Sequence, residues 1–140
     1  MANVSVKTPL PVAAGEVWDL IGNFNALPDW HPAVERSEIS EDKKTKITTR
    51  TLHLVGGGVI VEKLEQINPN ERAYRYSIVD SPLPVSNYTA TLTVHETPTG
   101  CEVEWASDFD AVGAAADEAA KVIQGIYDAG FDNLKKMFRM

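Results

Sequence analysis

The chain has 140 residues, 44% hydrophobic and 24% charged, a composition typical of one globular domain rather than of a disordered or fibrous chain. Its 13 Lys and Arg against 20 Asp and Glu give a net charge of -7, which opposes binding to nucleic acid and to anionic lipid surfaces. No apolar run approaches the roughly 18 residues of a membrane span, and no signal peptide is recognisable. We therefore expect a single domain over residues 1–140, soluble and cytoplasmic.

The first part of the chain predicts a strand followed by two short helices. Residues 4–8 have strand composition and are followed by a proline-marked turn. Residues 13–22 place apolar side chains at helical spacing and end on a glycine, the usual stop signal. Residues 23–30 leave room for another turn or two before Pro28 and Pro32 interrupt the helix.

From about residue 33 to residue 109 the hydrophobic period changes to two, which predicts six strands. Short separators rich in Gly, Pro, Asn and Asp favour antiparallel hairpins in a meander. The lone Cys101 cannot form an intramolecular disulfide, and we expect it to pack within the last strand. The predicted strands are 34–40, 46–55, 58–67, 73–79, 86–95 and 101–109.

A long helix is predicted at residues 115–138, where apolar residues return to helical spacing and acidic and basic residues mark the start and the end. It is the only element long enough to cover one face of the sheet. Gly125, Ala129 and Gly130 in its middle either leave room for a cavity or allow tight packing. The predicted fold class is α+β: a curved antiparallel sheet of about seven strands wrapped around the C-terminal helix.

Alternation along the strands assigns one row of side chains to the face that meets this helix. The row is aliphatic and aromatic, but it also carries charged and hydroxyl groups. Burying these groups without partners would be costly, so they must contact one another, water or a ligand. The expected cavity-facing residues are Arg50, Leu52, Glu62, Tyr74, Tyr76, Tyr88, Trp105 and Ser107 from the sheet, and Ile126 and Gly130 from the helix.

Arg50 and Glu62 are predicted to form an ion pair. Strand parity places them on one face of neighbouring strands, diagonally across the hairpin turned by residues 56–58. The pair either closes the inner end of the sheet or supplies a polar anchor inside an apolar pocket, as in many small-molecule sites.

Histidines give no support for a metal site. His31, His53 and His95 are scattered along the chain, and no pair has helical spacing or a neighbouring cysteine. The glycines at 56–58 precede a strand rather than a helix, which indicates a hairpin turn and not a phosphate-binding loop. We expect neither a metal nor a cofactor.

The sequence resembles the START-like helix-grip superfamily, also called SRPBCC, and within it the bacterial polyketide cyclase/dehydrase branch. The segments that carry the resemblance are VWDLIGNFNALPDWHPAVERSEI, GGGVIVEKLEQI, YRYSIVDSPLPVSNYTATLTV and VEWASDFD, followed by the long last helix. The resemblance covers essentially the whole chain. It implies a deep cavity between the sheet and the C-terminal helix, entered between the loop after the short helices and the loops that join strands.

This resemblance implies that Trp30 and His31 lie at or near the cavity mouth. The flanking Pro28 and Pro32 would hold both side chains in place at little entropic cost. The alternative is structural: Trp30 is a hydrophobic plug and His31 caps a loop carbonyl.

Two functions fit these residues. The first is binding of a small hydrophobic or aromatic molecule, with Arg50 or Glu62 orienting one polar group. The aromatic contact area would come from Trp30, Tyr76, Tyr88 and Trp105. We expect such a binding protein to be a monomer or a weak homodimer.

The second function is a cofactor-free polyketide cyclase or dehydratase that uses the same cavity. Candidates for its acid or base are Glu62, Tyr76 and His31, and Arg50 would stabilise an enolate. We favour binding, because the sequence has no compact acid–base group and pairing with Arg50 would keep Glu62 ionised.

Overall fold

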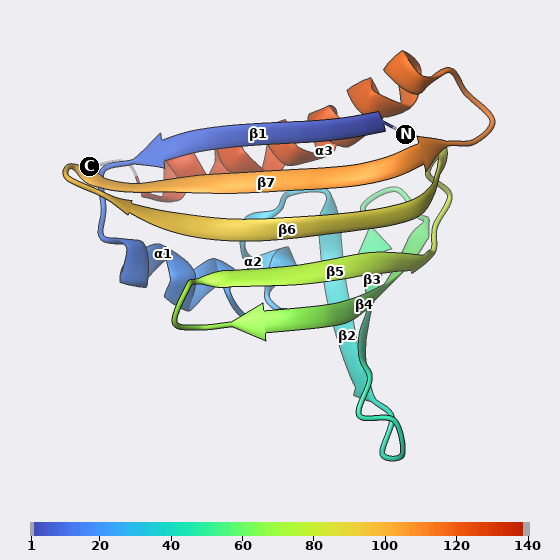
Figure 1. Ribbon diagram of the computed structural model, residues 1–140, viewed down its shortest axis with the longest axis horizontal. Helices are drawn as coiled ribbons and strands as arrows, with labels where there is room; N and C mark the ends of the chain where they lie inside the picture. The colour runs from blue at the N-terminus through green and yellow to red at the C-terminus, as the bar shows by residue number, and fades with distance from the viewer. Residues whose placement is uncertain (1, 139–140) are drawn as a thin grey trace.

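The computed structural model describes residues 2–138, in which a curved seven-stranded sheet wraps around one long helix (Figure 1). Every neighbouring pair of strands is antiparallel, and the order across the sheet is β1-β7-β6-β5-β4-β3-β2. This confirms the predicted helix-grip fold. The elements in chain order are β1 (Ala2–Leu10), α1 (Ala14–Ile21), α2 (Leu27–Trp30), β2 (Val34–Glu41), β3 (Thr48–Leu54), β4 (Val59–Asn68), β5 (Ala73–Asp80), β6 (Val85–Thr97), β7 (Gly100–Ala111) and α3 (Ala116–Met137).

The inward rows of the sheet follow the predicted alternation. Along β6 and β7 every second residue is buried over long stretches, because one strand face meets the helix and the other meets solvent. β1 runs on through Pro9, which an edge strand tolerates because the missing N–H leaves no ladder bond unmade. The buried members of the inward rows include Arg50, Leu52, Ile60, Glu62, Tyr74, Tyr76, Tyr88, Ala90, Leu92, Val94, Cys101, Val103, Trp105, Ser107 and Phe109.

The turn between β3 and β4 depends on glycine. Gly56, Gly57 and Gly58 all have positive φ, between 87° and 103°, which side chains with a Cβ rarely adopt. This turn fixes the register in which β3 meets β4.

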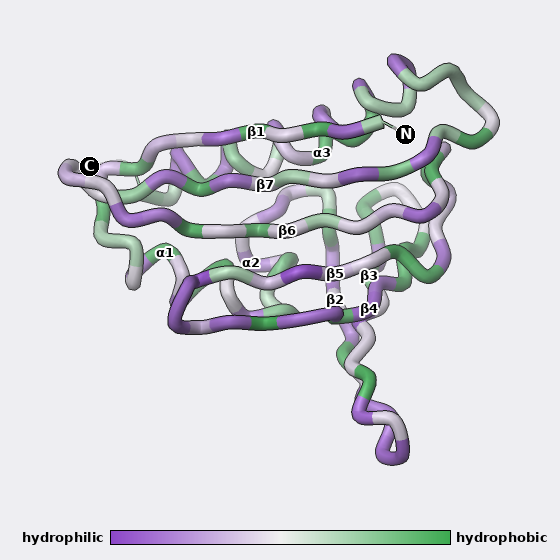
Figure 2. Tube along the Cα trace, in the orientation of Figure 1, coloured by the Kyte–Doolittle hydropathy of each residue, from purple (hydrophilic) through white to green (hydrophobic). Residues whose placement is uncertain are grey.

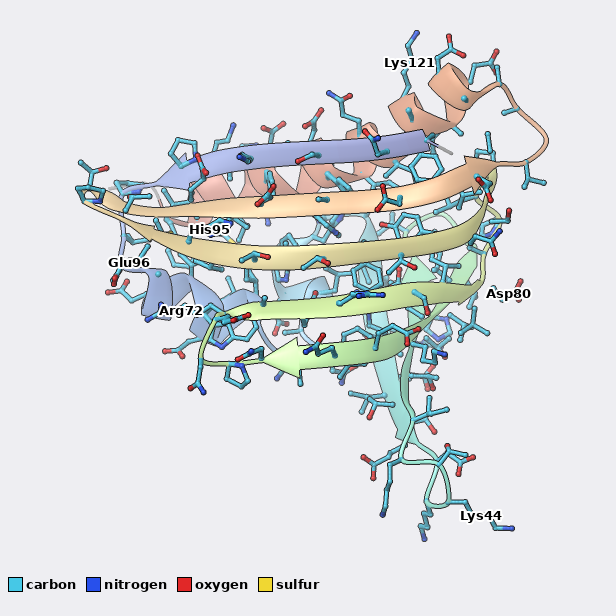
Figure 3. All side chains as sticks on the ribbon, in the orientation of Figure 1. Lys44, Arg72, Asp80, His95, Glu96 and Lys121 are labelled. Carbon is cyan, nitrogen blue, oxygen red and sulfur yellow. The ribbon has the colours of Figure 1, made fainter. Side chains whose placement is uncertain are left out.

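Helix α3 lies across the inner face, where it contacts β1 and β7, while α1 and α2 cover the part of the sheet that α3 leaves open (Figure 1). The β2–β3 hairpin projects away from this body. Its tip is hydrophilic (Figure 2), and Lys44 points outward from it (Figure 3). The buried residues of α3 are Ala119, Ile123, Tyr127, Gly130, Phe131 and Leu134.

Candidate functional site

A cavity of about 100 Å³ lies between the sheet and α3. Its walls are almost entirely apolar, and its polar groups are one carboxyl group, one imidazole, three phenols and one indole. The lining residues are Leu27, His31, Ala33, Val34, Leu52, Leu54, Ile60, Glu62, Tyr76, Ile78, Leu83, Tyr88, Trp105, Ile123, Ile126 and Tyr127.

The cavity reaches the surface at one end. Ala33 is exposed there, and Leu54, Ile78, Leu83 and Ile126 are half-buried, whereas the remaining lining residues are buried. The mouth is thus bordered by the loop after α2, the end of β3, the β5–β6 connection and α3. The loop after α2 and the β5–β6 connection correspond to the loops of the predicted entrance.

Three tyrosine hydroxyls and one indole form a hydrogen-bonded chain in the cavity wall. The Trp105 indole N–H donates to the Tyr76 hydroxyl over 2.9 Å, and the Tyr76 and Tyr88 hydroxyls lie 3.1 Å apart. The Tyr88 hydroxyl in turn contacts the hydroxyl of Tyr127, which comes from α3. The chain therefore joins three strands to the helix across the cavity.

A β-bulge aims Tyr88 into this chain. The register between β6 and β7 shifts between Ser86 and Thr89, and Asn87 has a positive φ of 52°. Bulges of this kind re-aim a side chain next to functional sites. The Asn87 side chain donates to Asp110 on β7 over 3.0 Å, which holds the bulge in place.

The three phenols are neutral donors over the physiological pH range. Burial raises the pKa of Tyr76 and of Tyr88 well above the ordinary value, and the neighbouring phenols raise both further. Burial also raises the pKa of Tyr127, although the neighbouring hydroxyls of Ser107 and Tyr88 oppose it. Each hydroxyl keeps its proton because a buried phenolate would be poorly solvated.

The predicted Arg50–Glu62 ion pair is confirmed, with Glu62 in the cavity wall and Arg50 behind it. Arg50 Nε and Nη2 are both 2.7 Å from Glu62 Oε1. Arg50 Nη1 donates to the Phe24 carbonyl over 2.6 Å. The two residues are directly opposite in the β3–β4 register, not diagonal as predicted.

Aromatic rings surround the guanidinium of Arg50, which has no exposed surface. Its Cζ lies 4.0 Å from the ring centre of Phe24, 5.0 Å from that of Tyr76 and 5.7 Å from that of Tyr74. Burial by itself would lower the pKa of Arg50, but the carboxylate of Glu62 holds it above its ordinary value. Arg50 is therefore a permanent cation stabilised by a carboxylate and by ring faces.

Glu62 presents its carboxyl group to the cavity from the other side of this pair. Both contacts to Arg50 use Oε1. Burial raises the pKa of Glu62 above its ordinary value, and the positive charge of Arg50 offsets only part of that rise. The cavity thus contains a carboxyl group that accepts a proton more readily than an exposed one.

His31 is fixed between the loop after α2 and helix α3. Its Nε2 lies 2.7 Å from the Ile126 carbonyl, and its Nδ1 accepts the Ala33 backbone N–H over 3.2 Å. These partners assign the neutral tautomer with the proton on Nε2. Burial lowers the pKa of His31, although the hydrogen bond to Ile126 opposes the shift. With both nitrogens engaged, His31 has no free lone pair for a general base.

Trp30 does not lie at the cavity mouth, which corrects the prediction. It is 1% exposed and packs beside Trp105, with ring centres 5.5 Å apart, outside the cavity wall. His31 lines the cavity but is only 2% exposed. The burial supports the structural alternative for Trp30, a hydrophobic plug, whereas His31 contacts the Ile126 carbonyl of α3 and not a loop carbonyl.

Glycine at position 130 makes this plug possible. A Cβ there would lie 2.8 Å from His31 Cδ2 and 3.0 Å from Trp30 Cζ3, closer than side chains pack. Gly130 thus permits tight packing and opens no space for a ligand. Gly125 is exposed and has no neighbour within 4 Å, so it plays no part in the cavity either.

The structure brings part of the predicted site together. Five predicted residues lie outside the cavity wall: Trp30 and Gly130 belong to the loop–helix packing, Arg50 and Tyr74 lie behind Glu62, and Ser107 is buried beside Tyr127. The predicted residues that do line the cavity are His31, Leu52, Glu62, Tyr76, Tyr88, Trp105 and Ile126.

Sequence reasoning missed Tyr127 as a site residue. Helical spacing places it on the same apolar side of α3 as Ile123, and a phenol among aliphatic neighbours was a signal that could have identified it. The other unpredicted lining residues are Leu27, Ala33, Val34, Leu54, Ile60, Ile78, Leu83 and Ile123.

Within residues 2–138 no group of three or more His, Cys, Asp and Glu side chains could hold a metal ion. The two other histidines each contact a glutamate on a neighbouring strand: His53 Nε2 lies 2.5 Å from Glu38, and His95 Nε2 lies 3.0 Å from Glu104. No helix in the same described range is long and apolar enough to cross a membrane.

The family described as polyketide cyclase/dehydrase and lipid transport matches residues 1–139. The chain belongs to this family. A comparison with curated proteins gave no match. The family assignment confirms the resemblance seen in the sequence, and it is compatible both with ligand binding and with cyclase chemistry.

Solved structures of similar chains agree with the fold. The protein XoxI from Bacillus cereus is 36% identical with a TM-score of 0.92, over 99% of this chain and 96% of that one. An uncharacterized protein from Bacillus thuringiensis is 35% identical with a TM-score of 0.90, over 98% of each chain. The Zhui aromatase/cyclase from Streptomyces shares the fold at 15% identity, with a TM-score of 0.73 over 96% of this chain and 88% of that one.

Proposed function

We propose that this member of the polyketide cyclase/dehydrase family binds a small hydrophobic, ring-containing molecule in the cavity between the sheet and α3. The observation that carries the proposal is the cavity itself: it is apolar, reaches the surface at one end, and contains a few convergent polar groups. Such a composition is usual for small-molecule sites.

The volume of the cavity limits the part of the ligand that it encloses. At about 100 Å³ it is of the order of the engineered apolar cavity of about 150 Å³ that binds benzene. One ring therefore fits. A larger ligand would extend through the mouth, where the half-buried Leu83 and Ile126 would have to move aside.

A matched pair of variants on α3 tests this proposal. Ile126→Phe places extra volume at the cavity mouth, whereas Val122→Phe adds the same group one helical turn away, on an exposed position outside the cavity wall. We expect the wild type and Val122→Phe to bind the one-ring hydrocarbon α-methylstyrene, and Ile126→Phe to lose most of the affinity.

Isothermal titration calorimetry measures this affinity, and native mass spectrometry of the freshly purified protein would reveal a ligand that co-purifies. Equal binding by both phenylalanine variants would locate the probe elsewhere and contradict the proposal. Absence of binding to the wild type would do the same.

A second candidate function, cyclase or dehydratase chemistry, is favoured by one observation. Glu62 lines the cavity with its pKa raised by burial, and the Tyr76, Tyr88 and Tyr127 hydroxyls in the same wall are neutral donors. A base that takes a proton from the carbon next to a carbonyl, together with a phenol that donates to the resulting enolate oxygen, would promote enolisation.

Deuterium exchange into the methyl group of acetophenone, followed by NMR in D₂O, tests this second function. An enzyme should exchange the methyl protons faster than buffer does, with a pH–rate profile that follows one group of raised carboxyl pKa. Binding without accelerated exchange would leave ligand binding as the function.

A further inference from the structure

The outer edge of β2 carries backbone groups that no other element pairs with. β2 is the last strand in the sheet order, so β3 covers only one of its two edges. Residues 35–41 are exposed apart from the half-buried Ser37, and no backbone group of a loop or helix in the described chain bonds to them. The opposite edge of the sheet differs, because β1 contains Pro9 and lies against α3. The free edge of β2 therefore offers N–H and C=O groups to another extended strand.

The shape of the molecule leaves space beside this edge. The end of β2 and the start of β3 form the hairpin that projects from the body of the protein (Figure 1). Ile39 lies on the strand that leads to the hairpin tip, and it is 50% exposed. Contact with an apolar side chain of a partner would remove this surface from water, which is favourable.

The charge of the hairpin tip is opposite to that of the whole protein. Lys43, Lys44 and Lys46 are exposed at the tip, and none of them forms an ion pair with another described residue. The chain as a whole carries a net charge of -7. A positive tip on an acidic protein is attracted to the acidic surface of another copy of the same chain.

A second copy fits both the edge and the charges. When two identical strand edges pair antiparallel about a two-fold axis, the tip of each hairpin lies beside the body end of the other strand. The body end of β2 carries the exposed Glu35. The tip lysines of one copy would therefore approach the partner's Glu35, and the same contact would occur twice.

The sequence of β2 allows few registers for such a pairing, because like charges directly opposite one another are destabilising. An axis at Ser40 would place Glu38 opposite the partner's Asp42. Axes at Ser37 and Ile39 place no like charges opposite one another. The axes that place a charged residue opposite itself are Glu35, Arg36, Glu38 and Glu41.

The β-bulge in β2 favours the axis at Ile39. The register with β3 shifts between Val34 and Arg36, and a bulge disrupts a ladder. An axis at Ser37 would carry the new ladder across this bulge, whereas an axis at Ile39 uses residues 36–42, which lie beyond it. In that register Ile39 contacts the partner's Ile39, and Arg36 is opposite the partner's Asp42.

We propose that the β2–β3 hairpin is a dimerisation arm: the free edge of β2 pairs antiparallel with the same edge of a second copy, with the two-fold axis at Ile39. The two seven-stranded sheets then join into one continuous sheet. The dimer needs no ligand, so this inference stands or fails separately from the proposed function.

Disulfide cross-linking tests the register. On the axis, the two Cα atoms of position 39 would lie about 4.5 to 5.5 Å apart, within the range of a disulfide. Ile39→Cys should therefore form a covalent dimer under mild oxidation. Glu41→Cys is the matched control, because the two copies of this position would be about 14 Å apart. The native Cys101 is 1% exposed and should not react.

A charge exchange tests the contact between the tip and the body end of β2. Lys43→Glu would face the partner's Glu35, so it should raise the dimer dissociation constant by roughly three- to thirtyfold. The double variant Glu35→Lys/Lys43→Glu should restore the wild-type value. Lys121→Glu on α3 makes the same change in net charge away from the hairpin and should leave dimerisation unchanged.

Sedimentation velocity over a range of protein concentrations measures these dissociation constants. A wild type that stays monomeric at every concentration would overturn the inference. Equal cross-linking of Ile39→Cys and Glu41→Cys, or equal weakening by Lys43→Glu and Lys121→Glu, would overturn it as well, since the contact would then not be this edge. None of these outcomes bears on ligand binding in the cavity.

Discussion

At the scale of single residues, the buried polar groups are divided between two clusters with different tasks. Arg50, behind the cavity wall, pairs with Glu62 in the wall and donates to a backbone carbonyl. The phenols form the second cluster, which is hydrogen-bonded and lines the cavity. The first cluster should therefore govern stability, and the second should govern what the cavity accepts.

Breaking the Arg50–Glu62 pair should be costly because the surviving partner is left buried without its counter-charge. We expect Arg50→Met or Glu62→Leu alone to lower the free energy of unfolding by about 3–5 kcal/mol. The double variant should cost clearly less than the sum of the two. Urea denaturation of the four proteins measures the coupling.

The exposed pair on the same strand is the control for this cycle. Lys63 Nζ lies 3.3 Å from Glu65 Oε2, and both side chains are about one third exposed. Glu65→Gln should therefore cost less than about 1 kcal/mol. Additive, small losses at Arg50 and Glu62 as well would show that the two residues do not interact in the folded protein.

His31 should make stability depend on pH in a predictable direction. Burial lowers its pKa in the folded state, so the unfolded state binds a proton more readily. The free energy of unfolding should fall as the pH drops below about 6.5, the ordinary histidine value, by at most about 1.4 kcal/mol per pH unit. Urea denaturation between about pH 7.5 and about pH 5.5 gives the slope.

A His31→Gln variant separates this effect from other titrating groups. It should lose the contribution of His31 to the slope, whereas Ile123→Val, a buried variant without a titrating group, should keep the wild-type slope. Identical slopes for His31→Gln and the wild type would mean that His31 does not lose its proton on folding.

At the scale of elements, helix α3 determines how close the Trp30–His31 loop can approach. Gly130→Ala gains helix propensity of about 1 kcal/mol, but its Cβ would collide with both loop rings. We expect the collision to win, with a net destabilisation of about 1–3 kcal/mol. Gly125→Ala on the same helix meets nothing and should stabilise by about 0.5–1 kcal/mol.

Thermal and urea unfolding of these two glycine variants test that difference. A gain in stability from both variants would show that the loop adjusts freely and does not plug the space beside α3. The two substitutions should change the free energy of unfolding in opposite directions. The difference comes from packing alone, because both glycines lie in the same regular helix.

The alternation of side chains predicted which face of each strand meets the helix. This feature is strongly specified, because a slip of one residue would turn every side chain of a strand to the opposite face. Parity therefore identified Arg50 and Glu62 as partners. It could not give their register, which depends on the three positive-φ glycines of the β3–β4 turn.

The placement of the Trp30–His31 loop could not be predicted in the same way. A loop between two prolines has no hydrophobic periodicity. The residues that flank an aromatic side chain do not show whether it lies at the rim of a cavity or in the core. What decides the matter is the fit against Gly130, about a hundred residues further along the chain. Tyr127 was missed for a related reason. Helical spacing shows which side of α3 faces the sheet, but it does not show which helical turn on that side lies next to the cavity.

At the scale of the whole molecule, the cavity between sheet and helix opens where the loop after α2 meets α3. Trp30 and His31 pack on α3 beside this opening. The mouth itself is formed by half-buried apolar residues. The β2–β3 hairpin projects away from the body of the protein (Figure 1), and none of the residues at its tip lines the cavity.

Hydrogen exchange should distinguish the cavity mouth from the hairpin tip when a ligand binds. Under the proposed function, acetophenone should slow amide exchange at the β5–β6 connection around Leu83, where the ligand orders the mouth, and in α3 around Ile126. Residues 42–47 at the hairpin tip lie outside the cavity wall and should exchange at the same rate with and without acetophenone, which makes them the internal control. Mass spectrometry of peptic fragments measures both regions in one experiment. Protection confined to the hairpin tip would place the ligand on the projecting strands and would contradict a binding site between the sheet and α3.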